Sequence, residues 1–171
     1  MADNVQVAIV IPVYNEEQNL RVLLDRLLPV MQGLGKSFEI IFIDDGSHDN
    51  SLHLLKEFAR GEHVKVVELT RNYGQHAAIM AGFSACRGDI VITMDADLQN
   101  PPEEIPRMLE VMEEGDYDVV GSIRRGRQDS LLRIFPSKII NIVARKITGV
   151  KMHDWGCMLR AYKKSVVDRM I

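Results

Sequence analysis

A chain of 171 residues, 46% of them hydrophobic, is long enough for one globular domain with a substantial core and too short for two ample ones. Its formal net charge of −3, with both signs interspersed, argues against a nucleic-acid-binding protein, which would carry a strong basic excess. The only cysteines, Cys86 and Cys157, lack metal-ligand spacing, so a reducing cytosol is expected. No uninterrupted apolar run approaches the roughly 18 residues of a membrane span, and the chain as given is expected to be soluble.

Strands and helices are expected to alternate along the chain. Apolar, β-branched runs predict strands at 7–13, 39–43, 64–69, 90–94 and near 118–121. Amphipathic patterns and capping residues predict helices at about 17–28, 49–60, 74–86, 102–114 and 163–171. Apolar strands joined by helices are typical of a parallel sheet that is covered on both faces. The sequence therefore predicts a doubly wound α/β domain.

The acidic stretch after the run at 90–94 is the strongest candidate for chemistry. Asp95 and Asp97 follow this strand and are separated by one small residue, Ala96. Side chains two positions apart in extended backbone point the same way, so both carboxylates are expected to face one point beyond the strand, where open α/β sheets bind ligands. Two hard oxygen donors suit Mg²⁺ or Mn²⁺ and a nucleotide diphosphate. The competing interpretation is a cap on the helix near Pro102, or two solvated loop residues.

Acidic residues also follow other predicted strands. Glu16 comes after the first strand, and Asp44 and Asp45 come after the second. No Gly-x-Gly-x-x-Gly follows the first strand, which argues against a dinucleotide-binding Rossmann enzyme. The tripeptide Gly-Lys-Ser at 35–37 precedes a strand and does not link a strand to a helix, so it is not a P-loop. A site lined with carboxylates suits base N–H groups, ribose hydroxyls and a metal-bridged diphosphate.

Four short motifs resemble those of family 2 glycosyltransferases with the GT-A fold. They are Pro-Val-Tyr-Asn-Glu at 12–16, Asp-Asp-Gly-Ser at 44–47, Asp-Ala-Asp-Leu-Gln at 95–99 and Trp-Gly-Cys-Met-Leu-Arg at 155–160. Within that family the chain is similar to the polyprenyl-phosphate glycosyltransferases. Segments 71–83, 97–107 and 154–162 most resemble the undecaprenyl-phosphate 4-deoxy-4-formamido-L-arabinose transferases. Bactoprenol glucosyltransferases and dolichol-phosphate mannose synthases share most of these motifs, so the resemblance is less specific for the sugar.

The resemblance implies a Rossmann-like GT-A fold, with a mainly parallel sheet and helices on both faces, and a set of donor-binding residues. The residues expected to bind the UDP-sugar are Pro12, Tyr14, Glu16, Asp44, Asp45 and Arg71, with Asp45 supporting the loop of Asp44. Those expected around the diphosphate and its Mg²⁺ or Mn²⁺ are Asp95, Asp97 and Gln99, with Asp97 acting directly in catalysis. A turn in which Asp44 or Asp45 bonds the backbone before Gly46 is the structural alternative, and it is compatible with binding.

The acceptor implied by the resemblance is a polyprenyl phosphate, and a phosphate monoester, with its second pKa near ~6, is largely dianionic at neutral pH. Such a nucleophile needs no general base, but its charge must be neutralised, for which arginine is well suited. Arg133 and Ser137, one helical turn apart, match an Arg and a Ser that contact the lipid phosphate in the family, and Arg124 is a further candidate. A solvated basic face is the competing interpretation. Asp154 resembles the family acid near the acceptor, and its role stays open.

Segment 131–147 alternates apolar residues with Arg and Lys, which predicts a basic amphipathic helix. Such a helix would let a lipid acceptor enter from the bilayer surface, although packing against the sheet is the commoner use of the pattern. The chain stops at residue 171 without a Gly, Pro or polar tail, while members of the family continue into transmembrane helices. Residues 1–171 are therefore expected to form a single catalytic domain, cut before C-terminal membrane segments.

These features predict an inverting, metal-dependent transferase that moves a sugar from a UDP-sugar to undecaprenyl phosphate at the cytoplasmic face of the bacterial inner membrane. The first candidate sugar is 4-deoxy-4-formamido-L-arabinose, in lipid A modification. The alternatives are glucosyl, mannosyl or hexosaminyl transfer to polyprenyl phosphate or to a glycan hydroxyl, and a nucleotide-binding module without turnover. The expected partners are the donor, the lipid acceptor and the membrane surface, with homo-oligomerisation left open and nucleic acid excluded.

Overall fold

The computed structural model describes residues 5–122 and 158–171. Within them, one sheet has the order β3-β2-β1-β4-β6-β5. Its strands are β1 (Val7–Val13), β2 (Phe38–Asp44), β3 (Val64–Glu68), β4 (Ile90–Thr93), β5 (Val119–Gly121) and β6 (Arg160–Lys163). The helices are α1 (Glu17–Gly33), α2 (Ser51–Phe58), α3 (Gln75–Ala85), α4 (Ile105–Glu114), which follows a 3-10 turn at Pro102–Glu104, and α6 (Lys164–Val167). The predicted α/β class is confirmed.

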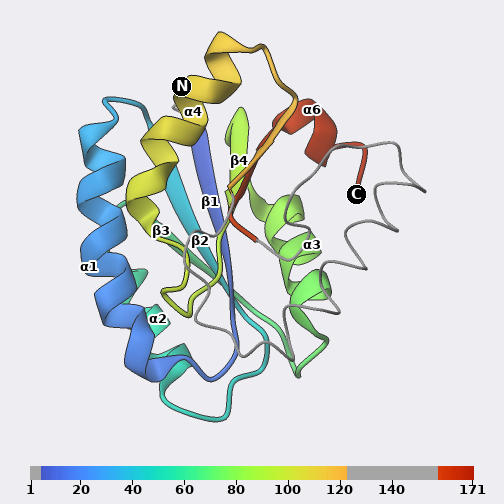
Figure 1. The fold of residues 1–171 in the computed structure, drawn as a ribbon. Coiled ribbons are helices and arrows are strands. Elements are labelled where there is room, and N and C mark those ends of the chain that lie inside the picture. The colour runs from blue at the N-terminus through green and yellow to red at the C-terminus, as the bar shows by residue number, and fades with distance from the viewer. Residues whose placement is uncertain (1–4, 123–157) are drawn as a thin grey trace, which may run out of the picture.

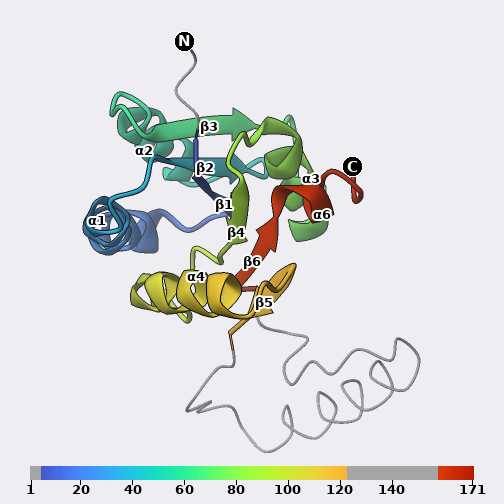
Figure 2. The same cartoon turned by 90° about the horizontal axis from the view of Figure 1, so that it is seen from above.

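Helices cover both faces of the sheet, as expected. Helices α1, α2 and α4 pack on one face, where their apolar side chains join those of the strands in the larger core. Helices α3 and α6 pack on the other face and form a second, smaller core. Figures 1 and 2 show this division, with α1 and α4 on one side of the strands and α3 and α6 on the opposite side. The three-layer arrangement explains why the central strands are apolar on both faces.

The carboxyl ends of β1, β2 and β3 are level, and β4 ends three residues earlier beside β1. Strand β1 pairs with β2 so that Val13 lies beside Asp44, and β2 pairs with β3 so that Asp44 lies beside Glu68. On its other side β1 pairs in parallel with β4, with Val10 beside Thr93. The chain therefore leaves β1, β2, β3 and β4 at one edge, at the bottom of Figure 1. Polar residues that follow different strands are brought together there.

The end of the chain differs from its prediction. A single helix was expected at 163–171, but Arg160–Lys163 forms β6, which pairs antiparallel with β4, and the helix that follows covers only Lys164–Val167. Only Val167 from this helix is fully buried, whereas Met170 and Ile171 are 47% and 60% exposed. A helix stabilised mainly by its packed face is expected to end where that packing ends.

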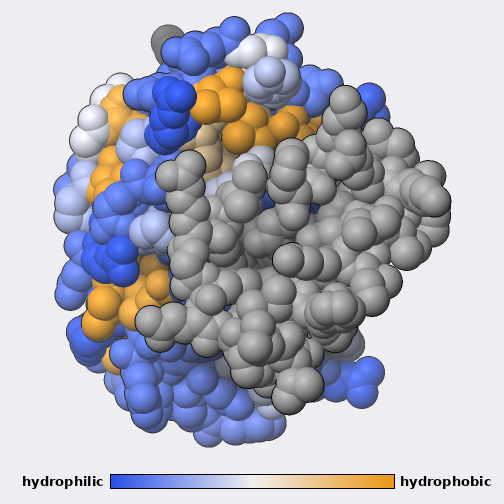
Figure 3. Space-filling model, viewed as in Figure 1, coloured by the Kyte–Doolittle hydropathy of each residue, from blue (hydrophilic) through white to orange (hydrophobic). Residues whose placement is uncertain are grey.

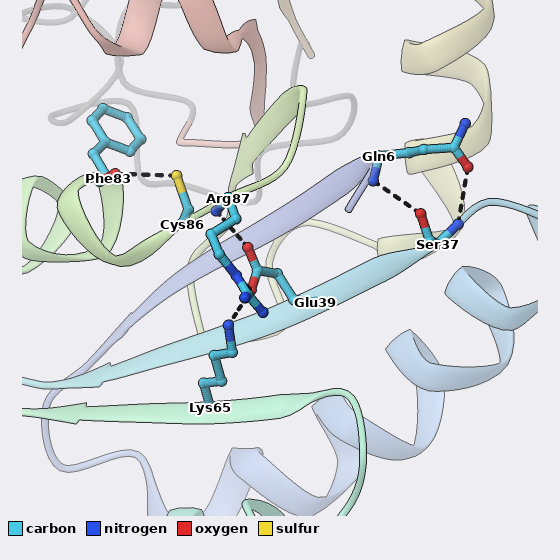
Figure 4. Close-up of polar contacts among 7 residues, drawn as sticks. All are labelled: Gln6, Ser37, Glu39, Lys65, Phe83, Cys86 and Arg87. Carbon is cyan, nitrogen blue, oxygen red and sulfur yellow. Dashed lines mark hydrogen bonds and ion pairs between the residues drawn. The ribbon is translucent and has the colours of Figure 1, made fainter. Parts of the chain in front are cut away.

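A buried acid holds the opposite edge of the sheet together. The Glu39 side chain on β2 is 4% exposed, and its carboxylate accepts hydrogen bonds from Lys65 Nζ on β3 and from the backbone N–H of Arg87, both at 2.6 Å. Figure 4 shows these contacts joining two strands to the connection between α3 and β4. Cys86 lies beside them, donates to the carbonyl of Phe83, and is buried, which raises the pKa of its thiol.

The part of the described surface that is visible in one view is mainly hydrophilic. Figure 3 shows hydrophilic residues over most of the described part of one face, with hydrophobic patches in its upper part and along its left side. Within residues 5–122 and 158–171, none of the helices combines the length and the apolar character that crossing a bilayer requires.

The close packing of α3 on the sheet gives a first prediction. A Cβ atom at Gly82 would lie 2.4 Å from Val10 Cγ1 and 2.8 Å from Ile43 Cδ1, whereas one at Gly33, at the end of α1, would meet nothing within 4 Å. We expect Gly82→Ala to lower the free energy of unfolding by about 1–3 kcal/mol through overpacking. Gly33→Ala is the matched control and should leave it unchanged or raise it slightly. Urea denaturation measures both, and equal values for the two variants would contradict this packing.

Candidate functional site

A pocket of about 620 Å³ opens at the carboxyl ends of the parallel strands. Its walls come from the end of β1, from the segments that follow β1, β2, β3 and β4, and from Met158, two residues before β6. The lining residues are Pro12, Val13, Tyr14, Glu16, Asp45, Asn72, Gly74, Gln75, His76, Asp95, Ala96, Asp97 and Met158. Six residues predicted from the sequence to bind the donor or its metal are among them: Pro12, Tyr14, Glu16, Asp45, Asp95 and Asp97.

The segment after β1 is fastened to the segment after β2. Asn15 adopts φ +56°, donates its backbone N–H to Ser47 Oγ at 3.1 Å, and accepts from the backbone N–H of His48 at 2.8 Å. The Tyr14 ring, 41% exposed, lies edge-on to the His48 ring with centroids 6.2 Å apart. These contacts hold an aromatic ring on the pocket wall, where it can stack on a planar ligand group.

Glu16 is positioned by the start of two helices. Its backbone N–H donates to Ser51 Oγ at 2.9 Å, and its carboxylate accepts from the Asn19 side-chain amide at 2.6 Å. Next to it, the backbone N–H of Glu17 donates to Asp49 Oδ2 at 3.2 Å. The first turns of α1 and α2 are thus tied to each other below the pocket, which keeps this wall in place.

Asp44 and Asp45 have different environments. Asp44 is 1% exposed and does not line the pocket; its Oδ2 accepts from the backbone N–H of Ser47 at 3.2 Å, which is the predicted turn, while its Oδ1 has no hydrogen-bond partner among the described residues. Asp45 lies on the wall, and its two oxygens accept from the backbone N–H groups of Tyr73 and Gly74 at 2.8 and 2.9 Å. Of these two carboxylates, that of Asp45 is the one that can contact a ligand in the pocket.

Gly46 allows the segments after β2 and β3 to touch. It adopts φ +69°, and a Cβ atom there would lie 2.5 Å from the backbone carbon of Arg71. The Arg71 side chain is exposed and points its guanidinium over the Tyr73 ring, 4.9 Å from the centroid. Arg71 was predicted to bind the donor, but the structure places it outside the pocket lining.

The acidic segment after β4 faces the pocket with both of its carboxylates. The backbone N–H of Met94 donates to the carbonyl of Val10. Asp95, Ala96 and Asp97 follow and line the wall. Ala96, between the two acids, is only 3% exposed. Asp97 Oδ1 accepts from the backbone N–H of Gln99 at 3.0 Å. Gln99 itself lines a neighbouring hollow of about 690 Å³, together with residues of α4 and β5.

These residues fit a divalent cation that is shared with a ligand. Asp95 and Asp97 supply two hard oxygen donors on one wall, and within residues 5–122 and 158–171 no group of three His, Cys, Asp or Glu side chains is placed to hold a metal. Mg²⁺ and Mn²⁺ sites of this kind use one or two carboxylates and complete the shell with water and substrate phosphates. The site therefore suits a cation that binds together with a diphosphate.

The residues predicted to bind the acceptor lie outside the described residues. They are Arg124, Arg133, Ser137, Asp154 and the segment 131–147. They stay predictions of the sequence.

The sequence interpretation missed the wall formed by the start of α3. Asn72, Gly74, Gln75 and His76 line the pocket, and Gln75 Nε2 donates to Asp95 Oδ1 at 2.6 Å. One sequence pattern could have indicated this wall. A helix that begins after a glycine, in the connection that follows a parallel strand, regularly faces a ligand at this edge of a sheet.

Comparison with known proteins agrees with this geometry. The family described as "Glycosyl transferase family 2" matches residues 8–171. The chain belongs to this family. Relatives named undecaprenyl-phosphate 4-deoxy-4-formamido-L-arabinose transferase are 58% identical in Pseudomonas fluorescens, over 96% of this chain and 49% of the relative, and 55% identical in Pectobacterium atrosepticum, over 100% and 53%. The chain spans about half the length of these relatives.

Solved structures of glycosyltransferases with low sequence identity to this chain show the same fold. Glucosyl-3-phosphoglycerate synthase from Mycobacterium tuberculosis, in complex with Mn²⁺, UDP and glucosyl-3-phosphoglycerate, superposes with a TM-score of 0.74 at 19% identity, covering 94% of this chain and 57% of that one. A mannosyltransferase from Pyrobaculum calidifontis, in complex with GDP-Man and Mn²⁺, gives 0.71 at 20% identity, covering 99% and 47%. The predicted GT-A fold is confirmed.

The Asp45 contacts give a second prediction, which concerns the shape of this family 2 pocket. Asp45→Ala leaves two backbone N–H groups without their acceptor, and we expect a loss of about 2–4 kcal/mol in the free energy of unfolding. Asp45→Asn keeps one acceptor oxygen and should lose less. Hydrogen exchange at the amides of Tyr73 and Gly74 should accelerate in Asp45→Ala, while the control Asp25→Ala on α1 leaves it unchanged. Unchanged protection at both amides in Asp45→Ala would contradict the role given to Asp45.

Proposed function

We propose that this chain is the catalytic part of an inverting transferase that moves a sugar from a UDP-sugar to undecaprenyl phosphate, with 4-deoxy-4-formamido-L-arabinose as the sugar. The observation that carries the proposal is the pair Asp95 and Asp97 on the wall of the strand-end pocket, in a chain 55–58% identical to relatives with that name. A single in-line displacement of UDP by the lipid phosphate would invert the anomeric centre.

The pocket residues divide between the two ends of the donor. The exposed Tyr14 ring offers a stacking surface for the base, and Asp45 offers carboxylate oxygens, which keep unused lone pairs, to the N–H groups of the base. Glu16 and Pro12 complete this part of the wall. Asp44 acts behind them, through its turn with Ser47, and not as a direct contact.

Asp95 and Asp97 are the residues that would hold Mg²⁺ or Mn²⁺, with Gln99 as a third candidate. When bound, the cation neutralises the charge that develops on the departing diphosphate. Asp97 keeps its carboxylate in place by accepting the backbone N–H of Gln99, which leaves its second oxygen for the pocket. Without a cation the two acids would repel a diphosphate.

The acceptor side is assigned from the sequence. Arg133 and Ser137 would bind the lipid phosphate, with Arg124 nearby, and this dianion needs neutralisation more than it needs deprotonation. Asp154 would orient the groups around that phosphate. Residues 1–171 would form one catalytic domain that works at the cytoplasmic membrane surface, with the basic segment 131–147 facing the lipid.

The metal requirement gives a third prediction. UDP should bind at least about tenfold more tightly with Mn²⁺ or Mg²⁺ than with EDTA, because the cation relieves the repulsion between the acidic pair and the diphosphate. Isothermal titration calorimetry compares the conditions, with uridine as the control ligand, whose affinity should not respond to metal. GDP should bind more weakly than UDP. Equal UDP affinity with and without a divalent cation contradicts the proposed site.

The fourth prediction concerns Asp97. Partners in the outer shell of a metal typically contribute 10–100-fold to its affinity, so a direct ligand should contribute at least as much. Asp97→Asn should therefore weaken metal-supported UDP binding by about tenfold or more and abolish turnover, while the melting temperature stays close to that of the parent chain because Asp97 lies outside the core. Asp25→Asn, an exposed change on α1, is the matched control. An active Asp97→Asn variant would remove Asp97 from the site.

The fifth prediction separates lipid from glycan acceptors. Arg133→Ala should lose sugar transfer to a short-chain polyprenyl phosphate and keep the UDP affinity of the parent chain, since Arg133 is assigned to the acceptor alone. Arg21→Ala, in an exposed ion pair with Glu57, serves as the control for lost positive charge. Radiolabelled or mass-spectrometric transfer assays measure the product. Turnover of soluble glycans in place of the lipid would replace the proposed acceptor.

A further inference from the structure

Gln75, the first residue of α3, touches the acidic pair from the side. Its side-chain Nε2 donates to Asp95 Oδ1 at 2.6 Å, and the residue also lines the pocket. An ionised carboxylate only accepts hydrogen bonds, so the amide must present its NH₂ group and not its oxygen. Twenty positions of sequence, which include α3 and β4, separate the two residues, so this contact exists only because α3 starts beside the end of β4.

The backbone of Gln75 is itself held from the other side of the pocket. The preceding residue, Gly74, donates its N–H to Asp45 Oδ2 at 2.9 Å, and its carbonyl accepts the first helical bond of α3 from Ala78 at 3.1 Å. Asp45 follows β2 and Asp95 follows β4. A chain of contacts therefore runs from Asp45 through Gly74 and Gln75 to Asp95, and it joins the wall assigned to the nucleoside to the wall assigned to the metal.

We propose that Gln75 is a positioning residue that orients the Asp95 carboxylate for the divalent cation and couples cation binding to nucleotide binding. The inference rests on the proposed function and goes beyond it by naming a residue that acts on the cation through Asp95. Groups that hydrogen-bond a ligating carboxylate fix its direction and set metal affinity. Since Gly74 and Gln75 move as neighbours, a nucleotide that fixes the Asp45 wall also fixes the residue that aims Asp95.

A neutral amide suits this position better than a charged side chain. A lysine ammonium would neutralise Asp95 and compete with the cation for it, and a second carboxylate would repel Asp95 at hydrogen-bond distance. The amide donates one hydrogen bond and leaves the charge of the acidic pair intact for the metal. Gln75 thus sets the direction of the carboxylate without changing the net charge of the acidic pair.

The experiment measures binding and needs no turnover. Mn²⁺ is titrated into the chain at saturating UDP, and UDP affinity is measured separately in EDTA, both by calorimetry. We expect Gln75→Ala to raise the apparent dissociation constant of Mn²⁺ by about tenfold and to leave metal-free UDP affinity within about twofold. Gln18→Ala is the matched control, because Gln18 is also an exposed glutamine in the first turn of a helix. It should change neither value.

A second variant separates the hydrogen bond from the shape of the side chain. Gln75→Met has a similar size and is a good helix former, so folding is preserved, but it removes the donor without adding a charge. We expect it to weaken Mn²⁺ binding about as much as Gln75→Ala. Mn²⁺ affinity at the parent value in both variants overturns the inference. A parent chain that binds UDP equally with Mn²⁺ and EDTA contradicts the proposed function instead, so the two failures are distinguishable.

Discussion

The pocket depends on one buried carboxylate that holds a distant loop. Asp45 is 3% exposed, and a carboxylate at that depth is stable only if its oxygens receive strong hydrogen bonds. The backbone N–H groups of Tyr73 and Gly74, nearly thirty positions later, supply them. This contact fixes where the chain turns from β3 into α3. Asn72, Gly74, Gln75 and His76 line the pocket because of it.

The two edges of the sheet put acidic residues to opposite uses. At the amino edge, Glu39 is buried and accepts hydrogen bonds from Lys65 and from the Arg87 backbone. Its charge therefore joins β2 and β3 to the connection that leads into β4. At the carboxyl edge, Asp95 and Asp97 line a pocket wall, where they can contact a ligand. Glu39 and the acidic pair lie at opposite ends of the strands and share no partner, so a change at Glu39 is expected to leave the pocket wall intact.

The sequence predicted the features that depend on local pattern. The apolar runs located the central strands, and the acids directly after them located Asp95 and Asp97 on the pocket. It did not predict β6, because Arg160–Lys163 carries a charged residue at each end and gains its strand form only from pairing with β4. It also missed Gln75, and it named both Asp44 and Asp45 without indicating which of them lines the pocket, since those assignments depend on how loops from separate strands meet. Contacts across the sheet edge have no local signal.

Strands β5 and β6 bring two points of the chain together at the sheet border. Gly121 lies beside Arg160 in an antiparallel pair, and the backbone N–H of Ser122 donates to the carbonyl of Leu159 at 3.0 Å. These two points are therefore neighbours in space although they lie far apart in the sequence. The entropy of closing a connection between fixed ends rises only slowly with its length. A change in the number of residues between Ser122 and Leu159 would therefore add little closure free energy, so this border can accept a difference in length between related chains at low thermodynamic cost.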